Sequence, residues 1–142
     1  MNLAWRLDFG AGMRAAVAFE QQIQLFHDAP LQDLAFAPQG ASQVLLWQGL
    51  CVPVVDMVQQ RSVRHPGQNA LVGLYATSDG VGALHLVGPS VKVQIQDGQC
   101  CELPDGQTNW RGLALACYWD AEYGATPIID LGRVFAQQRL PA

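Results

Sequence analysis

The chain has 142 residues, the length of one ordinary domain or of two very small ones. Hydrophobic residues make up 50% of it and charged residues only 14%, against about 25% in an average soluble protein. The net charge of −4 and the single lysine, Lys92, argue against binding to nucleic acid or to an anionic membrane surface, because both need clustered positive charge.

The first segments alternate in the way a half-buried strand does. Ala4 to Phe9 places apolar and charged residues in turn, Gly10-Ala11-Gly12 predicts a turn, and Arg14 to Phe19 returns, so we expect a hairpin. Residues 21–36 fit a strand or a short helix equally well. The start of the chain lacks the charged and apolar regions of a signal peptide, and we expect a cytoplasmic protein.

Short strands continue to the end of the chain. Val44 to Trp47 and Cys51 to Val55 predict two paired strands around Gly49. Asp79-Gly80 predicts a hairpin turn between two further strands. The remaining expected strands are residues 70–75, 81–87, 91–96, 113–119 and 125–129. Strands at this spacing indicate an all-β barrel or sandwich.

One phrase occurs twice, 74 residues apart. Pro53-Val54-Val55-Asp56-Met57 matches Pro127-Ile128-Ile129-Asp130-Leu131 in residue type at every position. Proline belongs at a strand start, an edge or a bulge, and aspartate is a favoured helix N-cap. Each copy therefore predicts an edge strand, an aspartate cap and a short helix. We interpret the pair as an internal duplication of two β units that pack against each other with a groove between them.

The first copy resembles a known family. Residues 49–57, "GLCVPVVDM", are similar to the Arg-Gly-x-x-x-Pro-hydrophobic-hydrophobic-Asp-Leu hallmark of the CheW-like domain, the chemotaxis coupling protein family. Residues 81–84, "VGAL", and the closing "YGATPIIDLGRVF" fit the same family in order. The resemblance implies that residues 1–142 are a single CheW-like domain made of two packed SH3-like five-stranded barrels, with short helices after Asp56 and Asp130.

The resemblance also implies a non-enzymatic adaptor that joins a chemoreceptor to a CheA-type histidine kinase and needs no cofactor. The chain departs from the family pattern at four positions. Gln43 stands where the family has glycine, Leu46 where it has asparagine, and Gln48 where it has arginine. Leu86 stands at a position that is usually acidic. We therefore expect a divergent partner surface. The predicted partner-binding residues are Trp47, Gln48, Gly49, Val52 and Asp56. For Val52 this requires a side chain that faces outward.

Two other functions stay open at the sequence level. A small β-barrel enzyme or ligand-binding protein would use a site built from Cys51, His85 and Asp56. An interaction subunit of a pilus or secretion complex would need no such site. The four cysteines contain no Cys-x-x-Cys, and we expect free, buried thiols that do not react. Among the aromatic residues, Trp110 and Trp119 each stand beside a charge and are candidates for an exposed patch.

Overall fold

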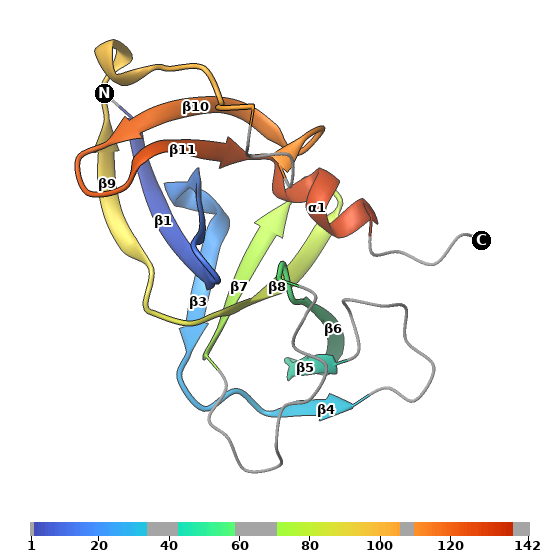
Figure 1. Cartoon of the computed structure of the whole chain (residues 1–142). Helices are drawn as coiled ribbons and strands as arrows, with labels where there is room; N and C mark the ends of the chain where they lie inside the picture. The colour runs from blue at the N-terminus through green and yellow to red at the C-terminus, as the bar shows by residue number, and fades with distance from the viewer. Residues whose placement is uncertain (1, 34–42, 59–70, 106–109, 138–142) are drawn as a thin grey trace.

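The predicted all-β class is confirmed by a computed structural model, which describes residues 2–33, 43–58, 71–105 and 110–137 (Figure 1). The elements are β1 (Asn2–Gly10), β2 (Met13–Ala18), the 3-10 helix η1 (Phe19–Gln21), β3 (Gln22–Phe26), β4 (Leu31–Asp33), β5 (Gln43–Trp47), β6 (Leu50–Val55), β7 (Leu71–Thr77), β8 (Gly80–Leu86), β9 (Val91–Ile95), η2 (Asp97–Gln99), β10 (Ala114–Asp120), β11 (Gly124–Ile129) and the helix α1 (Leu131–Gln137).

The expected hairpins form where their turn residues stand. β1 pairs with β2, β5 with β6 and β7 with β8, all antiparallel. At the first turn Gly10, Ala11 and Gly12 all have positive φ, between 54° and 91°. A positive φ suits glycine and costs an alanine, so only Ala11 is strained at this turn. Of the ambiguous residues 21–36, the described ones up to Asp33 form the strands β3 and β4 after the end of η1 at Gln21, so the strand alternative is confirmed there, and residues 34–36 lie outside the described residues.

The strands form two sheets. One has five strands in the order β10-β11-β2-β1-β9, and the other has six in the order β3-β7-β8-β6-β5-β4. We call the first the terminal unit, because both chain ends supply its strands, and the second the middle unit. Figure 1 shows β10 and β11 with α1 on one side of the molecule and β4, β5 and β6 on the other. The resemblance implied five strands in each barrel, and β4 makes the difference in the middle unit.

The two sheets repeat one pattern of pairing. In the terminal unit β10 and β11 pair antiparallel, β11 and β2 parallel, β2 and β1 antiparallel, and β1 and β9 antiparallel. The strands β5, β6, β8, β7 and β3 of the middle unit follow the same sequence of directions. The doubled phrase lies in equivalent strands, β6 and β11, because each pairs antiparallel on one side and parallel on the other. The duplication predicted from the sequence therefore corresponds to a repeat of the fold.

A short closing segment completes each sheet. In the middle unit β4 follows β3 and pairs with β5 at the far edge, with Leu31 opposite Leu45 and Gln32 opposite Val44. In the terminal unit an isolated antiparallel bridge joins Cys100 to Tyr118 of β10. The Cys101 N–H donates to the Cys117 carbonyl at 3.0 Å, which extends this pairing by one residue. We call this contact the closing seam, and it is the counterpart of β4 against β5.

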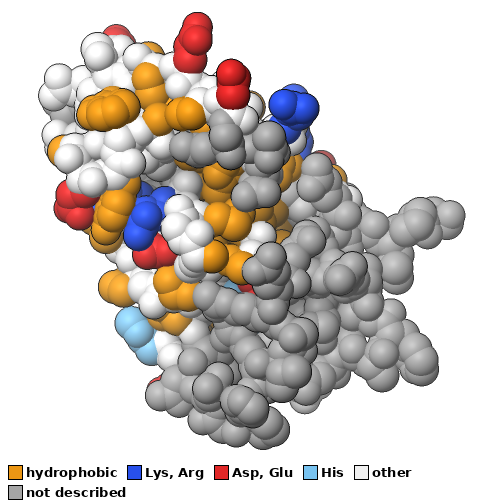
Figure 2. All heavy atoms as spheres, viewed as in Figure 1, with side chains coloured by type: hydrophobic (Ala, Val, Ile, Leu, Met, Phe, Trp, Pro, Cys, Tyr) orange, Lys and Arg blue, Asp and Glu red, His pale blue; other side chains and the backbone are white. Residues whose placement is uncertain are grey.

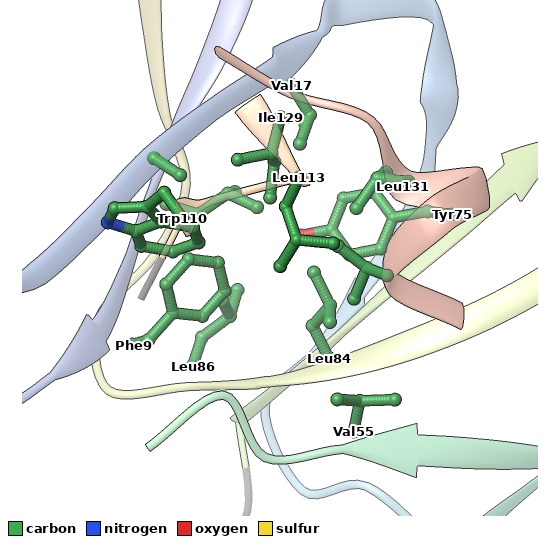
Figure 3. Packing of buried hydrophobic residues seen from close by; sticks show 13 residues of the cluster. Phe9, Val17, Val55, Tyr75, Leu84, Leu86, Trp110, Leu113, Ile129 and Leu131 are labelled. Atoms are coloured by element: carbon green, nitrogen blue, oxygen red, sulfur yellow. The ribbon is translucent and has the colours of Figure 1, made fainter. Parts of the chain in front are cut away.

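The main core lies between the two units. Its buried side chains come from β1, β2 and β11, from β6, β7 and β8, from the 110–113 turn and from α1. Figure 3 shows Phe9, Tyr75, Leu84, Trp110, Leu113 and Leu131 converging from these elements. Each unit also has a smaller cluster of its own, around Leu45 and Val54 in the middle unit and around Ala16 and Tyr118 in the terminal unit. The shared cluster fills the space where we expected a groove between the units.

The doubled phrase explains how one strand supplies side chains to two hydrophobic clusters. Adjacent residues of a strand point to opposite faces, so the apolar pair after each proline divides between them. Val54 packs in the cluster of the middle unit, and Val55 packs in the shared core. Ile128 and Ile129 divide in the same way in the terminal unit. Two consecutive apolar residues are therefore required at this point of each repeat.

The prediction of edge strands is wrong, because β6 and β11 are interior strands of their sheets. The parallel pairing of β6 with β8 begins at Val54, and that of β11 with β2 is at Ile128. Each proline thus precedes the stretch where its strand has neighbours on both sides. The missing proline N–H removes no hydrogen bond from that stretch.

The predicted helix after Asp130 is α1. Asp130 Oδ1 accepts hydrogen bonds from the N–H groups of Gly132 at 3.0 Å and Arg133 at 3.4 Å, as a helix cap does. Asp56 Oδ1 accepts one from the Val58 N–H at 3.1 Å, so the first copy of the phrase turns in the same way. The helix predicted after Asp56 begins at Met57, and only Met57 and Val58 of it are described, as a turn, because residues 59–70 lie outside the described residues.

Helix α1 also explains a glycine in β8. The ring of Phe135 lies against Gly82, where a Cβ atom would be 2.5 Å from it. A larger residue at Gly82 would push the helix away from the sheet. The glycine of the "VGAL" segment is therefore a packing requirement of the helix that follows the second copy of the phrase.

Candidate functional site

The candidate site is the tip of the β5–β6 hairpin. Trp47 and Leu50 are paired across the hairpin, and Gln48 and Gly49 form the turn with φ values of 48° and 78°. Two consecutive residues with positive φ are typical of a type I′ turn, which glycine tolerates and glutamine does not favour. Gln48 is therefore exposed at the end of a hairpin whose strands are paired up to Trp47 and Leu50.

The predicted partner-binding residues divide between surface and interior. Gln48 and Gly49 are exposed, and Trp47 is half-buried against the cluster of the middle unit. Asp56 is half-buried and accepts the hydrogen bond of Val58. Val52 is only 2% exposed and belongs to the same cluster as Leu45, so its side chain faces inward. The outward-facing role expected for Val52 does not fit this position, and we assign it to the core.

Two leucines beside the turn were not among the predicted site residues. Leu46 is 41% exposed and Leu50 is 51% exposed, so the hairpin presents apolar surface on either side of Gln48. The sequence carried a signal for Leu46, since it alternates with Leu45, which is buried. Leu50 follows a turn, where alternation does not determine the face. We define the hairpin tip as Leu46 to Leu50.

The terminal unit has an equivalent surface on the β10–β11 hairpin. Val44 stands opposite Pro53, and Cys117 stands opposite Pro127, so the two hairpins can be aligned residue by residue. Leu46 then corresponds to Trp119, which is 60% exposed. The exposed Tyr123 lies in the turn that follows. Both units thus place an apolar side chain outward at the same position of the same hairpin.

The aromatic candidates separate clearly. Trp119 is on the surface as expected, whereas Trp110 is 3% exposed and packs against Phe9 with ring centroids 5.9 Å apart. Trp110 therefore belongs to the shared core. Figure 2 shows hydrophobic side chains reaching the surface at several places among a few charged ones on the described part of this face.

Charge beside the second hairpin is organised around Tyr123. The guanidinium groups of Arg6 and Arg14 lie 4.8 and 3.8 Å from the centroid of its ring, which is cation–π geometry. Arg6 also forms an ion pair with Asp120 at 3.0 Å, and Arg14 lies 3.7 Å from Asp8. These contacts hold the ring of Tyr123, an exposed residue in the turn that follows β10.

A Cys51–His85–Asp56 site does not assemble. In the parallel register Val54 stands beside Ala83, which places Cys51 and His85 five residue positions apart, about 17 Å along the strands. Cys51 is exposed, and His85 is 4% exposed inside the protein. Within the described ranges we find no group of His, Cys, Asp and Glu side chains that could hold a metal ion.

The expectation of buried cysteines holds only for Cys117. Cys51 and Cys100 are exposed, and Cys101 is half-buried. Thiol reactivity therefore does not separate an adaptor from a cysteine enzyme, because exposed thiols react in either case. A hollow of about 260 Å³ lies beside Cys101 and Cys117, and its other lining residues are Leu103, Trp110, Arg111, Gly112, Ala114, Leu115 and Ala116.

Comparison with known proteins gives a match in structure but none in sequence. No family model and no curated protein matches the sequence. The solved structure of the scaffolding protein TtCheW from Thermoanaerobacter tengcongensis is similar over 92% of this chain and 84% of that chain, with a TM-score of 0.73 and 11% sequence identity. The chain has the CheW-like fold.

The CheW-like fold confirms the two-unit architecture that the doubled phrase and the family resemblance implied. The departures from the family pattern can now be placed. Gln48 is at the surface of the hairpin tip, and Leu46 is beside it. Leu86 is 2% exposed in the shared core, so a charge at this position would be buried here. In the described ranges no helix is long and apolar enough to cross a membrane.

Proposed function

We propose that this protein is a non-enzymatic adaptor of the chemotaxis type. It joins the cytoplasmic domain of a chemoreceptor to a CheA-type histidine kinase in the cytoplasm, and residues 1–142 act as one CheW-like domain. The observation that carries the proposal is the likeness to a scaffolding protein over nearly the whole chain. The repeated fold supports it, because two related units offer two related surfaces to two partners.

The hairpin tip is the proposed contact for one partner. Its turn residues Gln48 and Gly49 are held in a fixed conformation, and exposed leucines flank them. Exposed leucines beside a polar turn can supply both the buried apolar contacts and the hydrogen bonds that a specific interface contains. A stable contact of ordinary size buries roughly 1,200–2,000 Å² in total, so neighbouring residues of the middle unit take part as well.

Binding to purified partners tests the proposal. The kinase regulatory domain and the receptor cytoplasmic fragments of the same cell are titrated against the protein by calorimetry. Leu50→Asp places a charge in the proposed interface and is expected to weaken binding of one partner at least tenfold, roughly the effect of losing an interface anchor. Gln48→Arg, at the turn itself, is expected to change the affinity for the same partner.

Val87→Asp is the matched control, because Val87 is 47% exposed, similar to Leu50 at 51%, but lies after β8. Its affinity should stay within about twofold of the unmodified protein, as expected outside an interface. If no kinase or receptor of the cell binds, the proposal is wrong, and binding to a pilus or secretion component would identify the other kind of adaptor. Equal losses for Leu50→Asp and Val87→Asp would reject the hairpin tip as the contact.

A further inference from the structure

The closing seam of the terminal unit contains two facing thiols. The antiparallel bridge between Cys100 and Tyr118 sets the next pair, Cys101 and Cys117, directly opposite each other. Their Sγ atoms are 3.2 Å apart, and the Cys101 N–H donates to the Cys117 carbonyl at 3.0 Å. The side chains therefore already point toward one another across the seam.

The backbone geometry of this pair suits a disulfide. Hydrogen-bonded antiparallel partners have Cα atoms about 5.5 Å apart. A disulfide needs Cα atoms about 4.4–6.8 Å apart. A bond between the two sulfur atoms would therefore form by a small side-chain movement, with the strands left in place.

The middle unit shows that the fold does not require thiols here. Its equivalent seam pairs Gln32 with Val44, in the same register relative to the proline of the doubled phrase. The seam of the middle unit therefore forms with a glutamine and a valine at the positions that two cysteines occupy in the terminal unit. The thiol pair is thus an addition to the shared architecture and calls for a chemical role.

Both cysteines line the same hollow, and Cys101 is the more exposed of the two. Cys117 is 4% exposed and Cys101 is half-buried, and both line the hollow of about 260 Å³. Leu103, Trp110 and Ala114 line the same hollow, so its walls are mainly apolar. A small neutral oxidant fits such a space, whereas a protein reductant would have to act on Cys101 from outside.

We propose that Cys101 and Cys117 form an oxidation site, in which a hydroperoxide converts the two thiols to a disulfide across the closing seam. The more accessible Cys101 reacts first. Its thiolate attacks one peroxide oxygen, the O–O bond breaks, and the leaving hydroxide takes a proton and departs as water. Cys101 is then a sulfenic acid.

Cys117 completes the step. Its Sγ attacks the Cys101 sulfur, the S–S bond forms and the S–O bond breaks, and the hydroxyl leaves as water with the Cys117 proton. Two thiols and one hydrogen peroxide thus give one disulfide and two waters. Burial, with a further contribution from Cys101, raises the pKa of the Cys117 thiol, which fits its role as the second thiol to react.

The test uses the Cys51→Ser/Cys100→Ser double variant, in which only the facing thiols remain. Native protein is treated with a few equivalents of hydrogen peroxide, alkylated and weighed by mass spectrometry. The expected product is a monomer lighter by two hydrogen atoms that takes up no alkylating agent, and dithiothreitol restores both thiols. The bond closes a loop of roughly 17 residues, so the melting temperature should rise by roughly 5–10 °C.

Cys101→Gln/Cys117→Val is the matched variant, because it copies the seam of the middle unit. It should fold and keep its melting temperature when peroxide is added. The proposal is overturned if the two-thiol protein gains oxygen atoms, forms covalent dimers or keeps two reactive thiols. It is also overturned if the disulfide forms but lowers the melting temperature, because the bond would then disrupt the seam.

Discussion

At the scale of single residues, Arg6 and Asp120 form the most consequential polar contact among the described side chains. Asp120 is 4% exposed and accepts hydrogen bonds from Tyr118 at 2.7 Å and from the Glu122 N–H at 2.9 Å, besides the ion pair with Arg6. Burial acts to raise the pKa of Asp120, but these hydrogen bonds outweigh it and hold the pKa below its ordinary value.

Asp120→Asn is expected to lower the free energy of unfolding by about 2–4 kcal/mol at pH 7, because it leaves Arg6 partly buried without its charge partner. The folded-state pKa of Asp120 lies below its unfolded-state value. The carboxylate therefore stabilises the fold above about pH 4, and this contribution is lost as the pH falls through the folded-state pKa. Urea unfolding at pH 7 and at pH 3 should show the difference between the two proteins shrinking with acid.

Glu122→Gln is the control for that pair. The Glu122 carboxylate is 3.9 Å from Arg6, but its side chain is 66% exposed, so the exposed contact contributes little. Its backbone N–H still donates to Asp120 in the variant. If Glu122→Gln lowers the free energy of unfolding as much as Asp120→Asn does, the stabilisation does not come from the buried pair of Arg6 and Asp120.

Residue alternation predicted several faces from the sequence and missed others. The inward face of Leu45 and the outward face of Leu46 follow from it, because both stand in the middle of one strand. Alternation does not predict the burial of Val52, Trp110 and Leu86, because it depends on neighbours from distant parts of the chain. A single strand pattern says which residues share a face and leaves open which face is covered.

At the scale of elements, α1 depends on its first turn. The helix has only 7 residues, so it gains little from its own hydrogen bonds and relies on packing and capping. Leu131 and Val134 bury its inner side in the shared core, and Asp130 caps its start.

Asp130→Ala removes this cap and is expected to cost about 1 kcal/mol, as is typical of an aspartate N-cap. Asp56→Ala should cost a similar amount if both copies of the phrase work in the same way. Thermal unfolding measures both, with Asp28→Ala as the exposed control. If the melting temperature falls for only one of the two variants, the aspartate caps the chain in one copy of the doubled phrase, and its presence in the other copy is incidental.

Elements joined by tight turns were predictable, because their signals are local. Gly10-Ala11-Gly12, Gln48-Gly49 and Asp79-Gly80 lie at the predicted hairpin turns. The interior position of β6 and β11 was not predictable, since the parallel neighbours β8 and β2 are supplied from elsewhere in the chain. The closing segment at Cys100 and Cys101 was not predictable either. It pairs with a strand from elsewhere in the chain, and it is too short to show a strand pattern.

At the scale of the whole molecule, the chain changes units twice, from β2 to β3 and from β8 to β9. The middle unit is continuous in sequence, and the terminal unit is not. In the middle unit the residues after Asp56 lead directly to β7. The corresponding connection in the terminal unit, from α1 to β1, is cut by the chain ends.

A circular permutant that begins at Gln21 and ends at Glu20 is expected to fold, because it makes both units continuous and preserves every strand pairing. A linker of about ten Gly and Ser residues joins Ala142 to Met1. The melting temperature should fall by no more than roughly 5 °C relative to the natural chain, since the new ends lie between two strands.

The natural chain with the same linker added after Ala142 is the control for the linker itself. A permutant that is soluble but lacks cooperative unfolding would contradict the interpretation of two equivalent units. Sequence alone could not supply this design. The doubled phrase indicates a repeat, but the share of each unit drawn from the chain ends depends on long-range pairing.

The split origin of the terminal unit has a consequence for synthesis on the ribosome. The β1–β2 hairpin is translated before the middle unit, yet its sheet neighbours β9 and β11 are translated after it. The middle unit can form as soon as its own strands emerge, while the opening hairpin waits with its apolar face uncovered. The β1–β2 hairpin therefore reaches its final place only after the strands of the middle unit have been made.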